Sequence, residues 1–315
     1  MAPLRIIFMG TAEFSCPSLE QLAGTPGFQV VAVVTQPDRP KGRDLKLQAS
    51  AVKLLAEKLQ LPVLQPARAR EEGFINTLRD LRPDLMVVVA YGQILPQAML
   101  DLPAHGCLNV HASLLPKYRG AAPIQWAVAN GEAETGVAIM KMDAGLDTGA
   151  VLAEAVTPIG PEDDSPGLHQ RLAVLGADLL VKTIPDWVAG KVQPQPQPAT
   201  GSTYAAKIKK EDGQIDWNRP AAEIGRRLRG FLPWPGAFTF LTVEGKPQLL
   251  KIWRLEVMKY SGTPGEVLSA GADGITIGCG EGAVRVLELQ REGGRRQTAE
   301  QFLAGSVLRP GMKLG

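Results

Sequence analysis

Cysteine, aromatic residues and long apolar runs are scarce in this 315-residue chain, and each scarcity excludes a class of protein. The three cysteines, Cys16, Cys107 and Cys279, are odd in number and far apart, which predicts free thiols in a reducing compartment. They form no C-x-x-C pair, so neither a disulfide framework nor a zinc site is expected, and we predict no metal. An uncharged apolar run of about 18 residues is missing, and Arg5 interrupts the opening apolar segment, so we expect neither a membrane span nor a signal peptide. The sequence therefore predicts a soluble cytoplasmic protein with no membrane partner.

Short apolar runs rich in β-branched residues alternate with helical patterns over the first part of the chain. Runs typical of strands buried on both faces of a parallel sheet occur at Arg5–Met9, Val30–Thr35, Leu85–Ala90 and Leu108–His111. Apolar residues recur at helical spacing in Ser15–Ala23, Ser50–Leu59 and Glu71–Leu81. This alternation predicts a doubly wound α/β domain with a mostly parallel sheet and right-handed crossovers. Ligands of such sheets bind beyond the carboxyl ends of the strands, so chemistry is expected after Met9, Ala90 and Val110.

A proline-rich segment separates this domain from the rest of the chain. A strand is predicted at Ala150–Thr157 and a long helix at Ser165–Ala189, and Val192–Thr203 then has the sequence VQPQPQPATGST. Its alternating prolines favour an extended polyproline conformation, which we expect to join neither a sheet nor a helix. We therefore predict a first domain over residues 1–191, a linker over 192–203 and a second domain over 204–315.

The second domain has the pattern of a small β-barrel. Short strands with glycine turns between them are predicted at Ala237–Val243, Leu249–Leu255, Gly265–Leu268, Gly274–Ile277 and Ala283–Leu289. This spacing is typical of a small barrel similar to the oligonucleotide-binding fold.

The formal net charge of +2 hides a difference between the two parts of the chain. Up to Thr203 there are 17 basic and 20 acidic residues, a net charge of −3, whereas from Tyr204 onward there are 17 basic and 12 acidic residues, a net charge of +5. A basic second domain fits a module that binds a polyanion, and it equally fits a solvated, moderately basic surface.

The segment Asn109-Val110-His111 ends a predicted strand with two polar side chains. Strand alternation places Asn109 and His111 on the same face, which sets an amide donor beside an imidazole. An amide N–H can bind the oxyanion of a tetrahedral intermediate, and an imidazole can relay a proton, so the pair suits acyl transfer. The alternative is a strand end with ordinary turn capping and a surface imidazole.

No side chain near this pair has the setting of an activated nucleophile. Ser113 lacks a G-x-S-x-G turn, and Cys107 lies inside the apolar strand. We therefore expect direct aminolysis without a covalent acyl-enzyme.

The loop Met142–Gly149 carries two carboxylates, Asp143 and Asp147, among glycines. A carboxylate that reaches His111 would orient the imidazole and stabilise its charged form. The alternative is a hairpin turn in which aspartate serves only local hydrogen bonds.

Several motifs together resemble the 10-formyltetrahydrofolate-dependent formyltransferases, and among them the members that act on methionyl-tRNA. The matching segments lie in both domains and cover essentially the whole chain. They are Phe8–Phe14, Gln36–Arg43, Val87–Gly92, Asn109–His111, Ser113–Pro116, Tyr118–Gln125, Glu134–Val137, Asp143–Gly149, Tyr204–Lys207 and Leu232–Pro235.

The resemblance implies catalytic roles for Asn109, His111 and Asp147. It implies that Asn109 holds the formyl oxygen as it becomes an oxyanion, that His111 supports that charge, and that Asp147 fixes His111 and assists proton movement through water. It also implies 10-formyltetrahydrofolate as the formyl donor. Folate contacts, largely through the backbone, are implied for Ser113, Leu114, Leu115, Pro116, Tyr91, Gln93, Leu95 and Asp143.

The second substrate implied by the resemblance is initiator methionyl-tRNA, bound by a monomer. Gly10, Thr11 and Phe14 are expected to receive the methionine side chain. The basic loop Gln36–Ser50, with Arg39, Lys41 and Arg43, is expected at the tRNA acceptor end, although without the resemblance it would be interpreted as a solvated insertion. Expected phosphate contacts in the second domain are Lys207, Lys209, Lys210, Arg226, Arg227, Arg229, Arg291, Arg295 and Arg296. Trp217, Trp234 and Trp253 are expected in the barrel core rather than stacked on bases.

Three other functions fit part of the pattern. A sugar-nucleotide amine formyltransferase would share the three site residues, but its second domain would have no reason to be basic. A phosphoribosyl-glycinamide formyltransferase would end near Val192. A non-catalytic RNA-binding protein on a degenerate scaffold would not need Asn109, His111 and Asp147. A dinucleotide cofactor is not indicated, because Gly10–Phe14 lacks the G-x-G-x-x-G pattern.

Overall fold

The computed structural model describes residues 2–41, 46–243, 245–306 and 308–315. Contacts divide the chain into two compact units. Unit 1 consists of Met1–Pro123, Glu134–Pro158 and His169–Ala205, and unit 2 consists of Ile124–Ala133, Ile159–Leu168 and Ala206–Gly315. The proline-rich segment 192–203 therefore groups with unit 1, and two short stretches that precede it, Ile124–Ala133 and Ile159–Leu168, group with unit 2.

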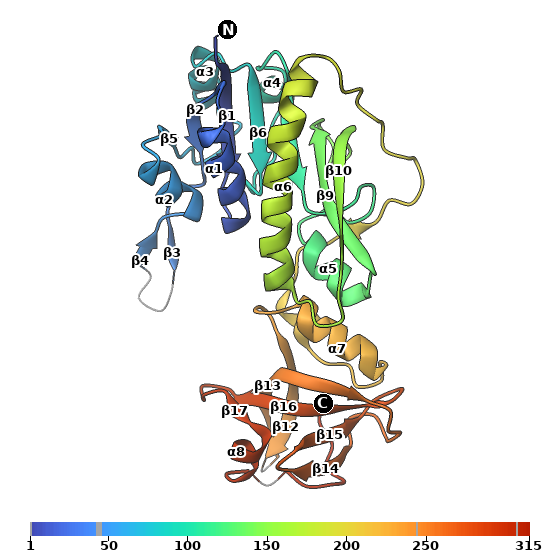
Figure 1. Cartoon of the computed structure of the whole chain (residues 1–315). Helices are drawn as coiled ribbons and strands as arrows, with labels where there is room; N and C mark the ends of the chain where they lie inside the picture. The colour runs from blue at the N-terminus through green and yellow to red at the C-terminus, as the bar shows by residue number, and fades with distance from the viewer. Residues whose placement is uncertain (1, 42–45, 244, 307) are drawn as a thin grey trace. The chain divides into compact units, whose positions relative to one another are not determined.

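Unit 1 is built on a seven-stranded sheet with the order β10-β9-β7-β6-β1-β2-β5 (Figure 1). The strands are β1 (Leu4–Gly10), β2 (Phe28–Val34), β5 (Val63–Leu64), β6 (Leu85–Val89), β7 (Cys107–His111), β9 (Glu134–Lys141) and β10 (Val151–Pro158). Strands β5, β2, β1, β6 and β7 are parallel, whereas β9 is antiparallel to both β7 and β10. The predicted mostly parallel, doubly wound sheet is confirmed, with its switch point at β1.

The helices of the first part of the chain begin and end within one or two residues of the predictions, except that the short helix at Gln97–Leu100 was not predicted. They are α1 (Cys16–Gly24), α2 (Ala51–Lys58), α3 (Glu72–Asp80), α4 (Gln97–Leu100), α5 (Pro123–Asn130) and α6 (Ser165–Val188), with a 3-10 turn at Glu13–Ser15. The start of α2 is fixed by Ser50, whose hydroxyl accepts a hydrogen bond from the Lys53 N–H at 3.0 Å. Among the helices that the structure describes, none combines the length and the apolar character that crossing a bilayer requires.

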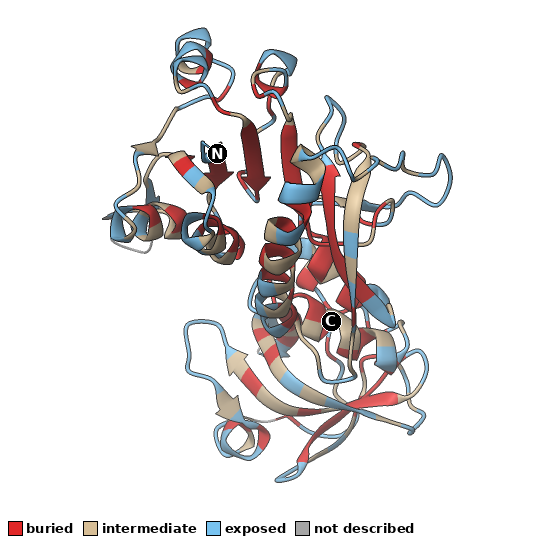
Figure 2. Ribbon diagram, turned by 45° about the horizontal axis from the view of Figure 1, so that its top comes forward, coloured by how far each residue is buried: buried red, intermediate tan, exposed pale blue. Residues whose placement is uncertain are grey.

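Strand β7 places the polar pair on one face of the sheet. The strand is buried throughout, as is its neighbour β6 (Figure 2). Val110 faces α6 at Gly176. The helix passes so close to the strand that a Cβ added at Gly176 would lie 2.7 Å from Cγ1 of Val110. Glycine therefore permits this helix to pack on the sheet, and alternation directs Asn109 and His111 to the opposite face.

The proline-rich segment is not an independent spacer, so the expectation that it joins no strand was wrong. Gln195 forms an antiparallel bridge with Val151, with N–H to carbonyl distances of 2.8 and 2.9 Å. A few residues later β11 (Tyr204–Ala205) pairs in parallel with β8 (Arg119–Gly120). Proline lacks an N–H group, but Gln195, which stands between two prolines, keeps its own, and this N–H donates to the Val151 carbonyl oxygen.

Unit 2 contains an antiparallel sheet with the order β12-β13-β16-β15-β14, and β17 pairs with β16. The strands are β12 (Ala237–Val243), β13 (Lys246–Met258), β14 (Val267–Gly271), β15 (Gly274–Gly278), β16 (Ala283–Arg291) and β17 (Gln297–Thr298). The last residues bridge the two edges of this sheet, since Leu314 pairs with Leu241 and Lys313 pairs with Glu266. The sheet therefore closes into the small barrel that the strand spacing predicted. Helices α7 (Ala221–Gly230) and α8 (Ala299–Leu303) complete the unit, with a 3-10 turn at Lys210–Gly213.

The three tryptophans expected in the barrel core do not behave alike. Trp217 is buried and its indole N–H donates to Thr239 Oγ1 at 3.1 Å. Trp253 is half-buried and donates to Gln290 Oε1 at 2.8 Å. Trp234 is 57% exposed. The core assignment is therefore confirmed for Trp217 and wrong for Trp234.

Candidate active site

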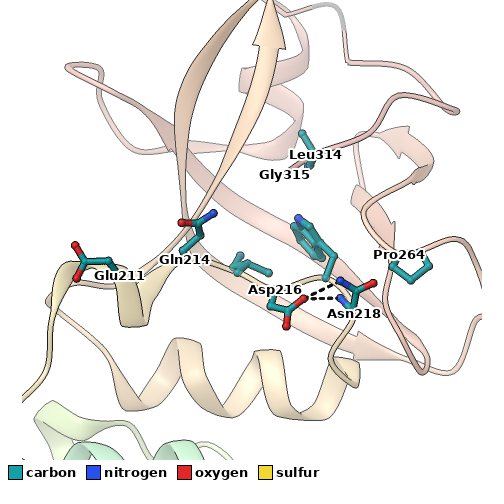
Figure 3. Close-up of a pocket in the computed structure, with 9 residues that line it drawn as sticks. Glu211, Gln214, Asp216, Asn218, Pro264, Leu314 and Gly315 are labelled. Carbon is teal, nitrogen blue, oxygen red and sulfur yellow. Dashed lines mark hydrogen bonds between the residues drawn. The ribbon is translucent and has the colours of Figure 1, made fainter. Parts of the chain in front are cut away.

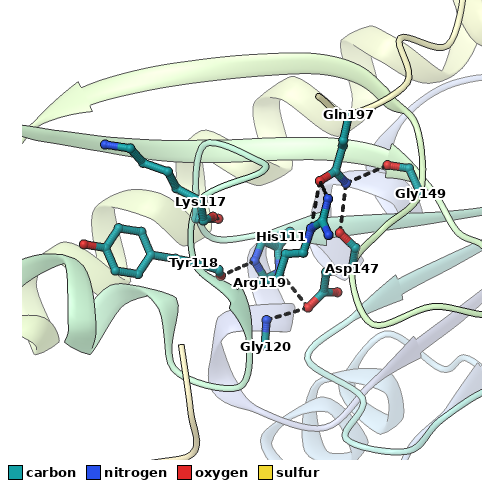
Figure 4. Close-up of polar contacts among 9 residues, drawn as sticks. His111, Lys117, Tyr118, Arg119, Gly120, Asp147, Gly149 and Gln197 are labelled. Atoms are coloured by element: carbon teal, nitrogen blue, oxygen red, sulfur yellow. Dashed lines mark hydrogen bonds and ion pairs between the residues drawn. The ribbon is translucent and has the colours of Figure 1, made fainter. Parts of the chain in front are cut away.

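His111 ends β7 with both ring nitrogens facing polar atoms of unit 1 (Figure 4). The side chain is buried, and Nε2 lies 2.9 Å from the carbonyl oxygen of Tyr118. A carbonyl oxygen only accepts, so Nε2 carries the hydrogen of this bond. Nδ1 is therefore the ring atom that is left to take up or release a proton, and it faces Asp147 at 3.8 Å.

The Asp147 carboxylate is held near His111 by the backbone of another loop. Its Oδ2 accepts a hydrogen bond from the Gly120 N–H at 2.8 Å and lies 3.8 Å from His111 Nδ1. The structure thus brings together the carboxylate and the imidazole whose meeting the resemblance implied. The backbone of Asp147 has a φ of +52°, a left-handed conformation that is uncommon for residues other than glycine.

Asn109 lies two residues before His111 on the same face of β7 and is 9% exposed. Among the described residues, we find no hydrogen-bond partner for its side-chain amide, and the amide is not sealed from solvent. A largely buried amide that keeps its donors free suits a ligand oxygen placed beside His111.

The loop after β7 is fixed by its own hydrogen bonds. The buried Ser113 hydroxyl donates to the Lys117 carbonyl oxygen at 2.7 Å, which ties it into the turn. Leu115 is buried against Ala138, Met140 and Val151, whereas Leu114 and Pro116 remain partly exposed. The predicted folate residues of this loop thus divide into two that stabilise it and two that are open to solvent.

The cysteines do not supply a nucleophile to this site. Burial, with a smaller contribution from Asp101, raises the pKa of Cys107 to about 12, so the thiolate is scarce near neutral pH. Burial raises the pKa of Cys279 to about 11 and also raises that of Cys16. With the Ser113 hydroxyl engaged, the described side chains around His111 fit direct transfer rather than a covalent acyl-enzyme.

Gln197 joins the loop of Asp147 to the loop of Arg119, and the sequence did not single it out. Gln197 Nε2 donates to the carbonyl oxygens of Asp147 and Gly149, both at 2.8 Å, and its Oε1 accepts from Arg119 (Figure 4). Gln197 stands in the repeat QPQPQP, where nothing distinguishes it from Gln193 or Gln195. The contact is long-range in sequence, so no local signal could have found it.

The ends of β1 and β6 carry the other predicted binding residues of unit 1. The Thr11 hydroxyl donates to the Tyr91 carbonyl oxygen at 2.9 Å, and Gly10 is buried beside it. Tyr91 is only 2% exposed and packs in the core with Leu95, and burial raises the pKa of its phenol to about 12. Gln93 Oε1 accepts from the Ala69 N–H at 2.8 Å.

Two further predicted residues have local partners. Phe14 is buried with its ring 5.2 Å from that of His169, in an edge-to-face contact. Asp143 is exposed, and its Oδ1 accepts from the Gly145 N–H at 3.0 Å and from the Thr148 hydroxyl at 2.6 Å. Asp143 therefore forms the local turn that the alternative interpretation expected, and the structure does not bring it to His111.

The basic residues expected to contact tRNA are only partly described. Arg39 is exposed at the start of β3 (Arg39–Lys41) and donates to the Gln36 side chain. Arg43 and the side chain of Lys41 lie outside the described residues. In unit 2, Lys207 and Lys209 are exposed, whereas Arg227 is half-buried against aromatic rings.

The pocket drawn in Figure 3 belongs to unit 2 and has a volume of about 490 Å³. Its lining includes Glu211, Asp216, Trp217 and Leu314, and none of Asn109, His111 and Asp147 contributes to it. Neither the hydrogen-bonding arrangement at β7 nor the free amide of Asn109 has a counterpart there. We therefore place the candidate active site at the end of β7.

Comparison with protein families agrees with this placement. The family model described as "Formyl transferase" matches residues 4–184, and the one described as "Formyl transferase, C-terminal domain" matches residues 207–307. The chain belongs to the formyl transferase family. The first match includes all three residues at the end of β7 and in the facing loop, and the second falls within unit 2.

Close relatives of this formyl transferase are similar over their whole length. A methionyl-tRNA formyltransferase of Geobacter sulfurreducens is 52% identical over 315 residues, which cover 100% of this chain and 98% of that protein. A methionyl-tRNA formyltransferase of Myxococcus xanthus is 50% identical over 311 residues, covering 99% of this chain and 98% of that protein.

Solved structures that are similar to this chain are more distant in sequence and show the shared fold. WlaRD, a sugar 3N-formyl transferase crystallised with dTDP and 5-N-formyl-THF, has a TM-score of 0.66 at 20% identity and covers 92% of this chain and 98% of its own. HypX of Aquifex aeolicus in complex with tetrahydrofolic acid has a TM-score of 0.60 at 18% identity and covers 96% of this chain and 47% of its own.

Proposed function

We propose that this formyl transferase moves a formyl group from 10-formyltetrahydrofolate to the α-amino group of methionyl initiator tRNA, in the cytoplasm, for translation initiation. The observation that carries the chemistry is the free amide of Asn109 on the same face as His111, whose Nδ1 faces Asp147 at 3.8 Å. The substrate assignment is supported by full-length relatives at 50–52% identity that are methionyl-tRNA formyltransferases.

The proposed reaction needs no covalent enzyme intermediate. The amino nitrogen forms a bond to the formyl carbon, the bond from that carbon to N10 of the folate breaks, and the proton lost by the amine ends on N10. Asn109 donates a hydrogen bond to the formyl oxygen while it carries negative charge in the tetrahedral intermediate. His111 supports that charge and relays the proton, and Asp147 holds the imidazole and assists the proton through water.

The residues around the strand ends fit a folate whose contacts are mostly to the backbone. We assign folate contacts to the loop Ser113–Pro116, to Tyr91, Gln93 and Leu95, and to the turn at Asp143. Support comes from the folate-type ligands printed for the two structural neighbours. Since Tyr91 and Leu95 have buried side chains, the assignment for these two rests on their backbone groups.

The tRNA contacts are assigned by charge and exposure. We keep the assignment of residues 1–191 as the catalytic domain, 192–203 as the linker and 204–315 as the tRNA-binding domain, and of the protein as a monomer. Lys207 and Lys209 are exposed, as phosphate contacts require, and Arg39 is exposed on the loop that also contains Lys41 and Arg43. Gly10, Thr11 and Phe14 stay assigned to the methionine side chain.

The alternative function, formylation of a sugar-nucleotide amine, is suggested by the structural similarity to WlaRD. At 20% identity that likeness shows the fold alone, and a net charge of +5 spread over the residues from Tyr204 onward suits a long polyanion such as tRNA better than one diphosphate. A phosphoribosyl-glycinamide substrate and a non-catalytic RNA-binding role are supported still less.

One assay separates these functions. Purified protein is mixed with 10-formyltetrahydrofolate and either charged initiator methionyl-tRNA, free methionine or a dTDP-amino sugar, and the formylated product is measured. We expect product with the charged tRNA only. Formylation of the amino sugar, or no product with any acceptor, would contradict the proposal.

A further inference from the structure

Gln197 joins the two loops that face His111. Its Nε2 donates to the carbonyl oxygens of Asp147 and Gly149, and its Oε1 accepts from Arg119 Nε at 3.0 Å and from Nη2 at 2.6 Å (Figure 4). We propose that Gln197 is a positioning residue for formyl transfer, which holds the Asp147 carboxylate at His111. This inference rests on the proposed function.

The orientation of the Gln197 amide is fixed by the chemistry of its partners. A guanidinium has only donors, and a carbonyl oxygen only accepts, so the amide oxygen must face Arg119 and the amide nitrogen must face Asp147 and Gly149. In this orientation both the amide oxygen and the amide nitrogen of Gln197 have hydrogen-bond partners. A glutamine in this place therefore has one orientation, and it cannot turn over without losing every one of these bonds.

The loop of residues 147–149 has an unfavourable backbone conformation that its surroundings must stabilise. Asp147 has a φ of +52°, and the left-handed region is sterically unfavourable for a residue with a Cβ. Such a conformation persists only when its surroundings fix it. The two bonds from Gln197 grip the carbonyl groups of Asp147 and Gly149, on the same short loop, and so supply that constraint.

The other end of the Gln197 amide reaches the loop that carries the partners of Asp147 and His111. Arg119 lies between Tyr118, whose carbonyl oxygen meets His111 Nε2, and Gly120, whose N–H meets Asp147 Oδ2. Gln197 thus connects the groups that face the two ring nitrogens of His111. Loss of the Gln197 side chain would disconnect the Asp147 loop from the loop that contains Tyr118 and Gly120, while leaving both loops in the protein.

The chain around Gln197 is held by bonds that do not involve its side chain. Gln195 pairs through its backbone with Val151, and the Thr203 carbonyl oxygen accepts from the Arg119 N–H at 2.9 Å. The segment therefore stays docked when only the Gln197 side chain is changed. Gln195 also offers a matched control, because its exposed side chain donates only to the neighbouring Gln193 carbonyl oxygen among the described residues.

The test measures single-turnover formylation of methionyl-tRNA at saturating folate for wild type, Gln197→Met, Gln197→Glu and the control Gln195→Met. Methionine keeps the shape and removes all the bonds, whereas glutamate keeps the pairing with Arg119 and removes both donated bonds. We expect both Gln197 variants to lose roughly 10-fold to 10²-fold in rate, since small misplacement of a reacting group has costs of this order. The KM for methionyl-tRNA should stay near that of Gln195→Met, and the rates are compared well below the melting temperature of each variant, because the lost hydrogen bonds should also lower stability.

A double-mutant cycle separates positioning from a general structural role. If Gln197 acts through Asp147, then Gln197→Met placed in an Asp147→Ala background should change the rate by less than about two-fold. An equal loss in both backgrounds would overturn the inference, as would wild-type rates for both single variants. Should Gln197→Met fail to fold, Gln197→Glu in the two backgrounds gives the same decision.

The wild type in the same assay keeps this inference distinct from the proposed function. No formylation of methionyl-tRNA by the wild type refutes the function. Formylation by the wild type together with unchanged rates for the Gln197 variants refutes only the role of Gln197.

Discussion

The Gly120 N–H donates to Asp147 Oδ2 at 2.8 Å, and the same oxygen lies 3.8 Å from His111 Nδ1. The Asp147 carboxylate is therefore fixed by a hydrogen bond from the backbone, whereas it lies near the imidazole without a direct hydrogen bond to it. Its position is set by the hydrogen bond from the Gly120 N–H rather than by a hydrogen bond to Nδ1. The gap is wider than a direct hydrogen bond, and it suits a water or a small closure when the substrates bind.

Replacing His111 tests the centre of this arrangement. His111→Ala removes the only imidazole at the end of β7, and we expect the rate of formyl transfer to fall by roughly 10²-fold or more, as general acid-base and oxyanion effects require. Single-turnover measurement with methionyl-tRNA gives the rate. His105→Ala provides the control, because it removes an imidazole that precedes the same strand. Near-native turnover of His111→Ala would remove the mechanism.

Gly120, whose N–H holds the Asp147 carboxylate, cannot take a side chain without strain. It has a φ of +111°, and a Cβ added there would lie 2.8 Å from the Ala205 carbonyl oxygen. Gly120→Ala should therefore displace the N–H that holds Asp147, and we expect a loss of stability of roughly 1–2 kcal/mol together with a loss of rate.

Melting temperature and single-turnover rate together check the Gly120 prediction. Gly73→Ala serves as the matched control, because Gly73 lies in α3 with a permitted φ and no atom within 4 Å of an added Cβ. That substitution should be neutral or slightly stabilising. A Gly120→Ala protein as stable and as fast as the Gly73→Ala protein would show that the contact with Ala205 has no consequence.

Much of the fold follows from local patterns, because buried parallel strands and amphipathic helices have strong periodic signals. Strands β1, β2, β6 and β7 begin and end within two residues of the predictions. Strand β9 was not predicted as a strand, and its position between β7 and β10 is a non-local fact of the sheet. Alternation alone placed Asn109 and His111 on one face.

The rest of the site depends on contacts between distant segments. The approach of Asp147 to His111 came from a resemblance between sequences, because a loop of carboxylates and glycines is equally a local turn, as Asp143 in fact forms. The partners of Gln197 lie 48 to 78 residues away, so its neighbours in sequence say nothing about them. The prolines around it led to a wrong expectation, since they suggested a spacer that pairs with nothing.

The basic loop Gln36–Ser50 should distinguish the two substrates. Arg43→Ala is expected to raise the KM for methionyl-tRNA, because it removes a planar donor suited to phosphates and base edges, and to leave folate binding unchanged. Steady-state kinetics gives the KM, and fluorescence titration gives the folate affinity. Arg79→Ala, at an exposed arginine of α3, controls for the loss of one positive charge from the same part of the chain. Equal loss of tRNA and folate binding would contradict the assignment of this loop.

Basic residues of unit 2 should divide between tRNA binding and stability. The Arg227 guanidinium lies 5.0 Å from the Phe231 ring centroid and donates to the Asp212 carbonyl oxygen at 3.1 Å, and burial lowers its pKa. Lys209 is exposed. Arg227→Ala should therefore lower stability by roughly 1–2 kcal/mol, as the loss of a cation–π contact and a charged hydrogen bond implies. Lys209→Ala should leave stability unchanged and reduce the slope of log affinity against log salt by about 1.

Thermal unfolding and salt titration of methionyl-tRNA binding separate these two roles. The same salt slope for wild type and Lys209→Ala would remove Lys209 from the phosphate contacts. A large change in salt slope for Arg227→Ala at unchanged melting temperature would instead favour the original expectation that Arg227 contacts phosphate.

His169 should make the stability of the protein depend on pH. Burial lowers the pKa of its imidazole below 6.5, and Glu13 opposes this only in part, while the ring packs against Phe14. Below pH 6.5 the unfolded chain therefore takes up a proton that the folded protein accepts only at lower pH, so acidification favours unfolding. This loss of stability begins near pH 6.5, grows as the pH falls to the lowered folded-state pKa and is constant below it.

The variant His169→Gln removes this proton uptake and keeps a neutral polar side chain. Melting temperatures of wild type and variant are compared at pH 8 and pH 5.5, so that other titrating groups cancel in the difference between the two proteins. We expect the wild type to lose more stability than the variant on acidification. A difference between wild type and His169→Gln that is the same at both pH values would show that the buried imidazole takes no part, because only a group with different proton affinity in the folded and unfolded states can make that difference change.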